Sequence, residues 1–510
     1  MARRSLTGIL SGRLSMARGR DLAQAAAEGA GDVFHPVITL TRGLRCQAAW
    51  LRAWWARTPS DRRGPVLFLA ASAMLVVTLL PYGPALVVLA VMGSAAWAGR
   101  DRNPVETGPD DTETAKLQAV YQALVPYLSD PADPKPLYAH DGSWEDAVTH
   151  YEFDDGRLVL LQVRYPAYFM DGDVEARARV ERLLHAKAGR GREYRFDWNE
   201  EENLVTLTAL PALTTGITAQ RFVTAPGETI LGFTDDDAVR LTIPVAEGEE
   251  TWDAPPVVWR TGPRSTEPHL LAVGRPGTGI TTLLRSIALQ ALHQGDVLVL
   301  DGAGTGEYAF LTGRPGVLAV ESGLAGTLAA LEWAARETER RLIAVNRARQ
   351  TGRQTPQDAR TPMWIVVDRP TALAHLAAAE GRPDPQELLE VPLRHGRAAN
   401  VTVAVGDQIE ALESLALVVR AHTRARVVLG QVSPAQVHAV LGLPPHTTPA
   451  AHIPAGRGYA RLGDGPVHRL QVPHTPDPHD EETGQAHAQA VLSLLPAHPT
   501  PEPGTSTAGP

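Results

Sequence analysis

The sequence predicts an α/β fold with a mostly parallel sheet and a glycine-rich P-loop, preceded by a small α+β domain and a membrane hairpin. Three observations predict it: a strand–glycine loop–helix unit over 270–294, alternating strand and helix patterns over 262–472, and an uncharged stretch over 64–99. Alternation of short apolar runs with amphipathic segments is typical of a parallel sheet covered on both faces.

The glycine loop follows the apolar run Leu270–Val273 and precedes a helix predicted over 283–294. Two glycines separated by four residues, then a dipeptide ending in Thr, match the spacing of a P-loop. Glycines allow backbone N–H groups to point at an anion, and the following helix offers its positive end. The candidate nucleotide-binding residues are Gly274, Arg275, Gly277, Thr278, Gly279, Ile280, Thr281 and Thr282.

Two positions depart from what a P-loop hydrolase requires. Ile280 occupies the place of the lysine that neutralises phosphate charge, and no lysine follows Lys187, so only Arg275 or Arg369 can replace it. The Thr281 hydroxyl and the strand-end carboxylate of Asp368 are the candidate Mg²⁺ ligands. Arg369 occupies the position after Asp368, where many such enzymes carry their catalytic Glu.

These departures predict ATP and Mg²⁺ binding with weak or absent hydrolysis. Relative to the expected pair, Lys to Ile removes one positive charge and Glu to Arg adds two, so the change is −1 + 2 = +1. The site therefore need not repel ATP, although it lacks a base. The alternative is a loop that keeps the fold and binds nothing.

Composition excludes cysteine-based sites and divides the chain by charge. Cys46 is the only cysteine among 510 residues, which excludes a disulfide framework and a cysteine zinc site. Residues 103–261 carry 14 basic and 29 acidic side chains (−15), whereas residues 262–472 carry 21 and 18 (+3). The P-loop segment is thus the more permissive one for phosphates, and the acidic segment is a candidate surface for a protein partner.

The N-terminal hundred residues predict attachment to a membrane. Residues 1–63 are rich in arginine and include a helix-like stretch over 37–57 with three tryptophans, expected to be an interfacial amphipathic helix. Residues 64–99 form two short apolar arms around Pro81–Pro84, expected to be a transmembrane hairpin; a re-entrant or monotopic hairpin is the alternative. Arginines flank both ends, so both termini are expected on the cytoplasmic side of the cytoplasmic (inner) membrane.

The remaining segments have recognisable patterns. Residues 103–261 predict an acidic α+β domain with helices over 116–128 and 173–188 and two β-hairpins, over 149–165 and 193–210. Residues 262–472 predict a helix over 324–349, strands over 363–367, 401–405 and 425–429, and a terminal hairpin over 456–470. Residues 473–510 are rich in Pro, His, Thr and acid and are expected to be disordered.

Taken together, the motifs over 262–472 resemble the FtsK/SpoIIIE family of membrane-anchored DNA pumps, including TraB-type actinobacterial transfer proteins. The pieces that carry the resemblance are the loop 274–282, the strands ending at Asp301 and Asp368, Glu337–Arg341, His395–Asn400, the strand ending at Gln408, and Gly456–Arg461. The resemblance implies a RecA-like motor domain that forms a hexameric ring, uses ATP and threads double-stranded DNA.

By matching position, the resemblance implies that Gln408 senses the γ-phosphate and, with Asp368, belongs to the catalytic set. It also makes Arg369 and Arg397 candidates for contacts with phosphate or a neighbouring subunit. Three interpretations stay open: a pseudo-motor of a DNA-transfer or conjugation system, an active double-stranded DNA translocase, and a membrane scaffold that binds a protein partner. Ile280 and Arg369 favour the first.

Overall fold

The computed structural model describes residues 110–497 apart from 190, 236–238, 249, 446 and 449–452. The described residues from Asp111 onward belong to one compact unit. The predicted amphipathic helix and transmembrane hairpin lie outside the described residues. Within the described ranges, no helix combines the length and the apolar character that a bilayer crossing requires.

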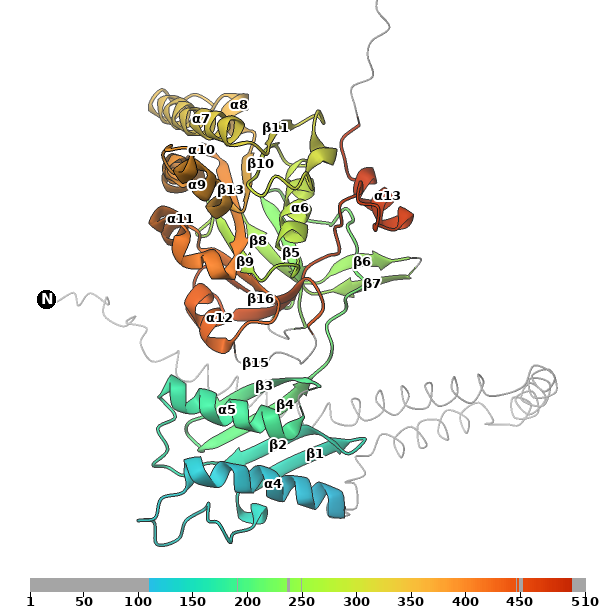
Figure 1. Ribbon diagram of the computed structural model, residues 1–510, viewed down its shortest axis with the longest axis vertical. Helices are drawn as coiled ribbons and strands as arrows, with labels where there is room; N and C mark the ends of the chain where they lie inside the picture. The colour runs from blue at the N-terminus through green and yellow to red at the C-terminus, as the bar shows by residue number, and fades with distance from the viewer. Residues whose placement is uncertain are drawn as a thin grey trace, which may run out of the picture. The chain divides into compact units, whose positions relative to one another are not determined.

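Residues 111–210 form the predicted α+β domain (Figure 1). Its strands lie in the order β1-β2-β4-β3, and a short strand from much later in the chain, β15, completes the sheet. Both predicted hairpins are confirmed as antiparallel pairs, β1 with β2 and β3 with β4. The elements are α4 (Asp111–Leu128), a 3₁₀ turn (Trp144–Asp146), β1 (Val148–Asp154), β2 (Arg157–Arg164), α5 (Val174–Ala188), β3 (Glu193–Asn199), β4 (Leu204–Leu210) and β15 (Thr447–Thr448).

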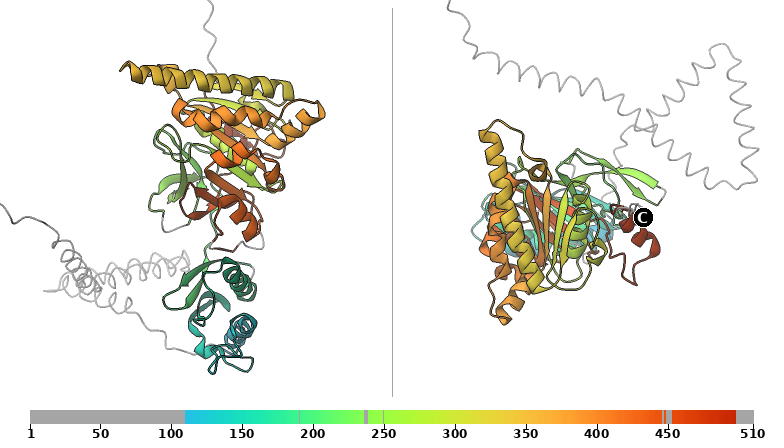
Figure 2. Two further views of the ribbon diagram at one scale, coloured as in Figure 1. Left: turned by 90° about the vertical axis from the view of Figure 1, so that its left-hand side faces the viewer. Right: turned by 90° about the horizontal axis from the view of Figure 1, so that it is seen from above.

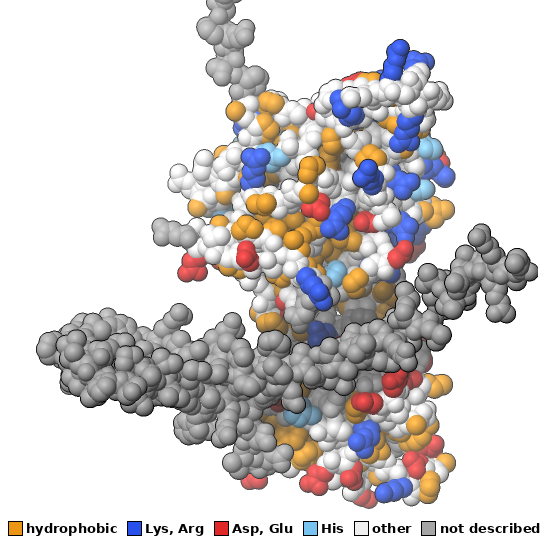
Figure 3. Space-filling model, turned by 180° about the vertical axis from the view of Figure 1, so that it is seen from behind, with side chains coloured by type: hydrophobic (Ala, Val, Ile, Leu, Met, Phe, Trp, Pro, Cys, Tyr) orange, Lys and Arg blue, Asp and Glu red, His pale blue; other side chains and the backbone are white. Residues whose placement is uncertain are grey.

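One face of this sheet carries both helices. Val205 and Leu207 alternate on β4, and they share a core with Leu124 of α4 and Leu184 of α5. The Asp173 side chain caps α5 by accepting from the Glu175 N–H. In the space-filling view, acidic side chains are spread over the visible face of this domain (Figure 3).

The rest of the unit is built on one large mixed sheet with the strand order β11-β10-β12-β13-β9-β14-β16-β17-β5-β8. The first six strands of this order, from β11 to β14, are parallel to their neighbours. The last four, β16, β17, β5 and β8, pair antiparallel. The strands are β5 (Glu228–Phe233), β8 (Pro256–Arg260), β9 (Leu270–Gly274), β10 (Asp296–Asp301), β11 (Val317–Glu321), β12 (Met363–Asp368), β13 (Val401–Gln408), β14 (Ala425–Leu429), β16 (Arg457–Leu462) and β17 (Val467–Gln471). A separate hairpin is formed by β6 (Ile243–Glu247) and β7 (Glu250–Ala254).

Helices cover both faces of the parallel part (Figures 1 and 2). Alternate residues of β12 belong to different cores: Trp364 and Val366 pack with α6, whereas Ile365 and Val367 pack with α7 and α10. Continuous burial on both sides explains why these strands are apolar runs rather than alternating patterns. The helices are α6 (Ile280–Ala291), α7 (Leu324–Gln350), α8 (Gln357–Arg360), α9 (Pro370–Ala379), α10 (Glu390–Ala399), α11 (Leu417–His422), α12 (Pro434–Leu441) and α13 (Gln485–Ser493), with 3₁₀ turns at Ala309–Leu311, Pro385–Leu389 and Ile409–Ser414.

Two predicted boundaries are wrong. Residues 228–260 do not belong to the α+β domain, because β5 pairs with β17 and β8 pairs with β5, which places both strands in the large sheet. Residues 473–497 are not disordered: Thr475 is fully buried, and α13 places Val491 in the core on the α6 face. This segment is rich in Pro and His overall, but a few of its apolar residues, such as Val491, pack into the core. Residues 498–510 lie outside the described residues.

Buried His269 makes the stability of the large-sheet domain dependent on pH. The residue precedes β9 and its Nδ1 accepts the Val403 N–H at 3.1 Å. Burial, then the nearby His422, lowers the pKa of His269 from 6.5 to about 3. The folded state thus resists a proton that the unfolded state accepts, so this stabilisation is complete above pH 6.5 and is lost as pH falls toward 3.

We expect the native chain to lose about 2 kcal/mol of this stabilisation between pH 7.5 and pH 5. His269→Asn keeps an acceptor for Val403 and removes the titration, so its unfolding free energy should change by about 2 kcal/mol less over the same interval. Urea unfolding at both pH values measures this, with exposed His375→Asn as the control. Equal pH dependence in the native chain and in His269→Asn would contradict the assignment.

Candidate functional site

The P-loop connects β9 to α6 through two glycines with left-handed backbone. Gly277 has φ +76° and Gly279 has φ +101°, a region that side chains with a Cβ rarely adopt. A Cβ at Gly279 would also lie 3.1 Å from the backbone N of Gly456. Gly456 donates its N–H to the Thr278 carbonyl at 2.8 Å, so the segment before β16 supports the loop from outside.

Parallel register brings the remaining site residues to the same edge of the sheet. Asp368 pairs with Asp301 on one side, and Gln408 pairs with Gly274 on the other, so the strand that ends in Gln408 lies between the P-loop strand and the Asp368 strand. A cavity of about 290 Å³ opens at this edge. All eight predicted P-loop residues except Thr278 line it, together with Asp368, Arg369, Asp407 and Gln408.

Thr281 and Asp368, the predicted Mg²⁺ ligands, are in direct contact. The Thr281 hydroxyl donates to Asp368 Oδ2 at 2.8 Å, and the buried Tyr308 hydroxyl donates to the same oxygen at 2.9 Å. Burial raises the pKa of Asp368 to about 6, against the opposing effect of these two hydrogen bonds and of Arg369. Asp368 Oδ1 is buried and has no hydrogen-bond partner among the described residues.

This pair fits a hard divalent cation held jointly with phosphate. Mg²⁺ takes oxygen ligands and is usually bound through one or two protein groups plus the phosphates of its nucleotide. A hydroxyl next to a carboxylate with a free oxygen supplies such groups. Within the described ranges, no cluster of three or more His, Cys, Asp and Glu side chains suits a metal site made only of protein. Thr281 and Asp368 are thus the residues that could hold Mg²⁺ together with phosphate oxygens.

Ile280 is partly buried: it lines the cavity, packs against the hydrophobic core and offers phosphate no charge. Its side chain packs against the core on the α6 face, and its Cγ2 would lie 2.7 Å from a Cβ added at Gly406 of β13. Glycine at 406 thus leaves the space into which the isoleucine packs. Because this side chain carries no charge, the α6 N-terminus lacks the cation that a P-loop lysine supplies.

Arg369 follows β12 in a left-handed conformation (φ +52°, ψ +58°) and begins α9. Such a backbone costs a non-glycine residue about 1 kcal/mol. The Arg369 charge lowers the pKa of both Asp368 and Asp407, although burial keeps both pKa values raised overall. Asp407 accepts hydrogen bonds from the Thr371 N–H and hydroxyl and from the Gln408 N–H. Arg369 therefore acts electrostatically on two carboxylates of the cavity.

Arg397 lies away from the cavity and from the P-loop. It is exposed near the C-terminus of α10 and donates to the Ser265 carbonyl at 3.4 Å. Helix α10 leads into the beginning of β13, whereas the P-loop faces the end of that strand. A phosphate contact by Arg397 within its own subunit is therefore excluded. A contact with a neighbouring subunit stays a prediction.

The cavity residues that sequence reasoning missed include Arg285, Glu307 and His474. Arg285 lies four residues after Thr281, a spacing that puts both side chains on one face of α6 and could have revealed it. Glu307 follows the turn in which Asp301 accepts the N–H groups of Gly304 and Gly306, at 3.0 and 2.9 Å. His474 comes from the segment expected to be disordered, so no local pattern pointed to it.

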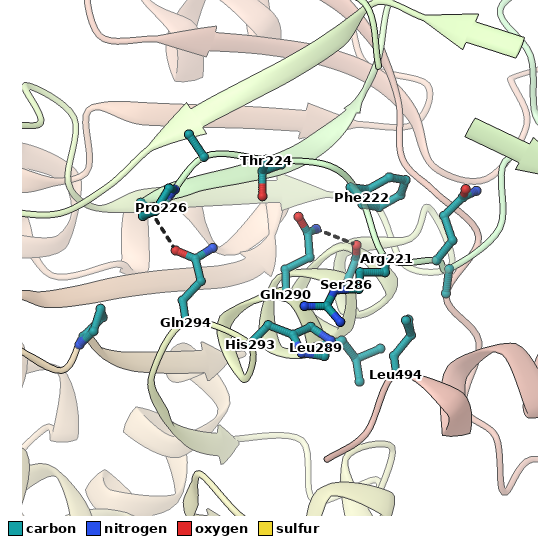
Figure 4. A pocket seen from close by; sticks show the side chains of 15 residues that line it. Arg221, Phe222, Thr224, Pro226, Ser286, Leu289, Gln290, His293, Gln294 and Leu494 are labelled. Carbon is teal, nitrogen blue, oxygen red and sulfur yellow. Dashed lines mark hydrogen bonds between the residues drawn. The ribbon is translucent and has the colours of Figure 1, made fainter. Parts of the chain in front are cut away.

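A second and larger cavity, of about 450 Å³, lies beside the C-terminal half of α6 (Figure 4). Gln290 of α6 and Gln294, which follows the helix, extend toward β5 and the segment before it. Their amides bond to the backbone of Ile230, Gly227 and Glu228. Its lining includes none of the P-loop residues. These amides hold β5 against α6, so we assign the chemistry to the smaller cavity.

Comparison with known proteins gave structural neighbours only. No family model and no curated protein matches the chain. The pCW3 conjugation coupling protein TcpA, in a monomer form with ATPγS, is similar at 13% identity and TM-score 0.42, over 75% of this chain and 99% of that one. The cytoplasmic domain of the type VII secretion ATPase EccC of Thermomonospora curvata is similar at 20% identity and TM-score 0.39, over 57% and 34%. EssC (ATPases 2 and 3) of Geobacillus thermodenitrificans is similar at 14% identity and TM-score 0.41, over 56% and 52%. This chain thus spans about a third and about half of the last two.

The strand order and the positions of the motifs establish the fold. The P-loop follows β9, the strand-end carboxylate Asp368 follows β12, and Gln408 ends the strand between them. This arrangement confirms the RecA-like P-loop fold expected for residues 262–472. The motifs that carry the resemblance to the FtsK/SpoIIIE family lie along that fold in the expected order.

Proposed function

We propose that this chain is a membrane-anchored pseudo-motor of a DNA-translocation or conjugative-transfer system, which binds Mg·ATP and hydrolyses it weakly or not at all. The observation that carries the proposal is the composition of one cavity. It keeps the glycine loop, the Thr281–Asp368 pair and Gln408, but has Ile280 and Arg369 where hydrolysis needs a lysine and a carboxylate.

Each group of the cavity would have a separate role in binding Mg·ATP. The backbone N–H groups of the loop and the start of α6 would hold phosphate oxygens, and Thr281 with Asp368 would hold Mg²⁺, which screens phosphate charge when bound. Gln408 would contact the terminal phosphate. Under this proposal the chain assembles as a homo-oligomeric ring, hexameric by resemblance, around double-stranded DNA at the inner membrane. The acidic α+β domain is the surface for a protein partner.

An active double-stranded DNA translocase is the second candidate, and Glu307 is the observation that favours it. This half-buried carboxylate lines the same cavity as Asp368 and Arg369. A carboxylate there could take the place of the missing base, because a base is defined by its reach to the attacking water rather than by its position in the sequence. DNA-stimulated turnover that is lost in Glu307→Gln would favour this candidate over the pseudo-motor.

Nucleotide binding by the full chain in detergent is the test of the proposal. We expect saturable, Mg²⁺-dependent binding of ATPγS by isothermal titration. Asp368→Asn should lose most of the Mg²⁺ dependence, since the amide cannot supply an anionic ligand and still accepts from Thr281 and Tyr308. As a control, exposed Asp358→Asn on α8 should bind like the native chain. Absence of ATPγS binding at millimolar concentration would refute the proposal.

A further inference from the structure

Arg285 is a buried cation that lines the P-loop cavity. It lies on α6 one turn after Thr281, and only 6% of its surface is exposed. Its Nε–H donates to the Thr475 carbonyl at 3.0 Å. Its Nη1 is buried and has no hydrogen-bond partner among the described residues. One side of this guanidinium is therefore fixed by protein, while the other retains unused donors.

No carboxylate in the described part of the chain forms an ion pair with Arg285. Among the ion pairs of the described residues, none includes Arg285, although other buried arginines, such as Arg341, Arg457 and Arg469, each have an acidic partner. A buried charge without a counter-ion costs several kcal/mol, so proteins normally supply one. In this cavity the missing counter-ion corresponds to the anion that the P-loop is shaped to bind.

The two arginines expected from the sequence are less suited to this role. Arg275 is exposed on the loop, where solvent screens its charge. Arg369 acts on two carboxylates, Asp368 and Asp407, so its charge is already partly used by protein. Arg285 is the cavity arginine that combines burial with free donors.

The C-terminal segment holds the guanidinium in place. His474 exchanges backbone hydrogen bonds with the chain before β5: its N–H donates to Ile217 at 2.8 Å, and its carbonyl accepts from Ala219 at 2.9 Å. This pairing fixes the neighbouring Thr475 carbonyl beneath Arg285. Burial, then His487 and Arg285, lowers the pKa of His474, which disfavours a second positive charge beside the arginine.

We propose that Arg285 binds the phosphate oxygens of a nucleoside polyphosphate in the P-loop cavity and supplies the positive charge that Ile280 does not. The inference rests on the proposed nucleotide binding and adds the residue that makes it possible. A guanidinium can pair with two phosphate oxygens at once, which suits an anion approached from the side of α6. Recognition is directed at the phosphates and not at the base.

The test compares three variants of the full chain by isothermal titration with Mg·ATPγS, tripolyphosphate and adenosine. Arg285→Met keeps an extended side chain but removes its charge. Arg285→Lys keeps the charge but removes the planar guanidinium with its paired donors. Arg349→Met, the control, changes an exposed arginine of α7. We expect Arg285→Met to weaken ATPγS and tripolyphosphate binding at least tenfold and leave any adenosine binding unchanged. Arg285→Lys should bind between Arg285→Met and native, and Arg349→Met like native.

Thermal unfolding without ligand separates this role from a structural one. Because Arg285→Met removes an unpaired buried charge, it should melt at or above the native temperature while losing the shift that ATPγS causes. Native binding with equal ATPγS affinity in Arg285→Met would overturn this inference and leave the proposed function intact. A native chain that binds no ATPγS would overturn both. Arg285→Met could instead bind ATPγS weakly and melt well below the native temperature, while Arg285→Lys binds ATPγS as tightly as the native chain. That result would assign Arg285 a structural role and overturn the inference.

Discussion

Turnover of ATP should rise at least about 100-fold over the native background when both missing groups are restored in Ile280→Lys, Arg369→Glu. The lysine would follow the path of Ile280 along the start of α6, and the glutamate would begin α9 beside Asp368. The lysine would neutralise phosphate charge and the glutamate would act as a base, so neither single variant should recover more than a small part of the gain in turnover. A coupled assay of phosphate release, with duplex DNA present, measures it.

The control for this gain is the same double variant with Asp368→Asn, which removes the carboxylate that bonds to Thr281. This triple variant should release phosphate only at the background rate of the native chain. If the native chain is already as active as the double variant, the two substitutions do not disable hydrolysis, and the interpretation as a pseudo-motor is wrong.

Glu193→Gln should lower the unfolding free energy by about 3 kcal/mol. Glu193 begins β3 and forms ion pairs with Arg457, at 3.4 Å, and with Arg469, and all three side chains are at most 10% exposed. Removing this carboxylate leaves two buried arginines with less compensation, although Arg469 retains Asp235 at 2.5 Å. Urea unfolding of the full chain measures the loss.

Exposed Glu201→Gln, in the turn between β3 and β4, is the matched control and should change the unfolding free energy by less than about 0.5 kcal/mol. An equally small change in Glu193→Gln would mean that this cluster does not stabilise the packing of β16 and β17 against β3. The cluster deserves this test because its partners are more than 260 residues apart in sequence.

Local patterns were sufficient to predict most of the fold. The β9–loop–α6 unit, the strand 425–429 and the two hairpins of the α+β domain depend on residues close in sequence, and all are confirmed. The placement of β5 and β8 in the large sheet could not be predicted, because it depends on the pairing of Phe233 with Gln471 across the domain. The burial of Thr475 depends on long-range packing in the same way.

The site was predictable where motif spacing applies and not elsewhere. Parallel register brings together Gly274, Asp368 and Gln408, as the order of strand ends implied. The spacing of Arg285 from Thr281 indicates a shared helix face, but its burial without an acidic partner is visible only in the structure. Ile280 could be identified as a departure, but the reason that it fits, the space left by Gly406, lies on a strand 126 positions away.

The most direct test of the central claim is ATP hydrolysis by the native full chain, measured with and without duplex DNA in the same preparation that binds Mg·ATPγS. We expect saturable binding together with phosphate release that is no faster than that of Asp368→Asn, whether or not DNA is present. DNA-stimulated turnover well above that variant would contradict it and identify the chain as a working translocase.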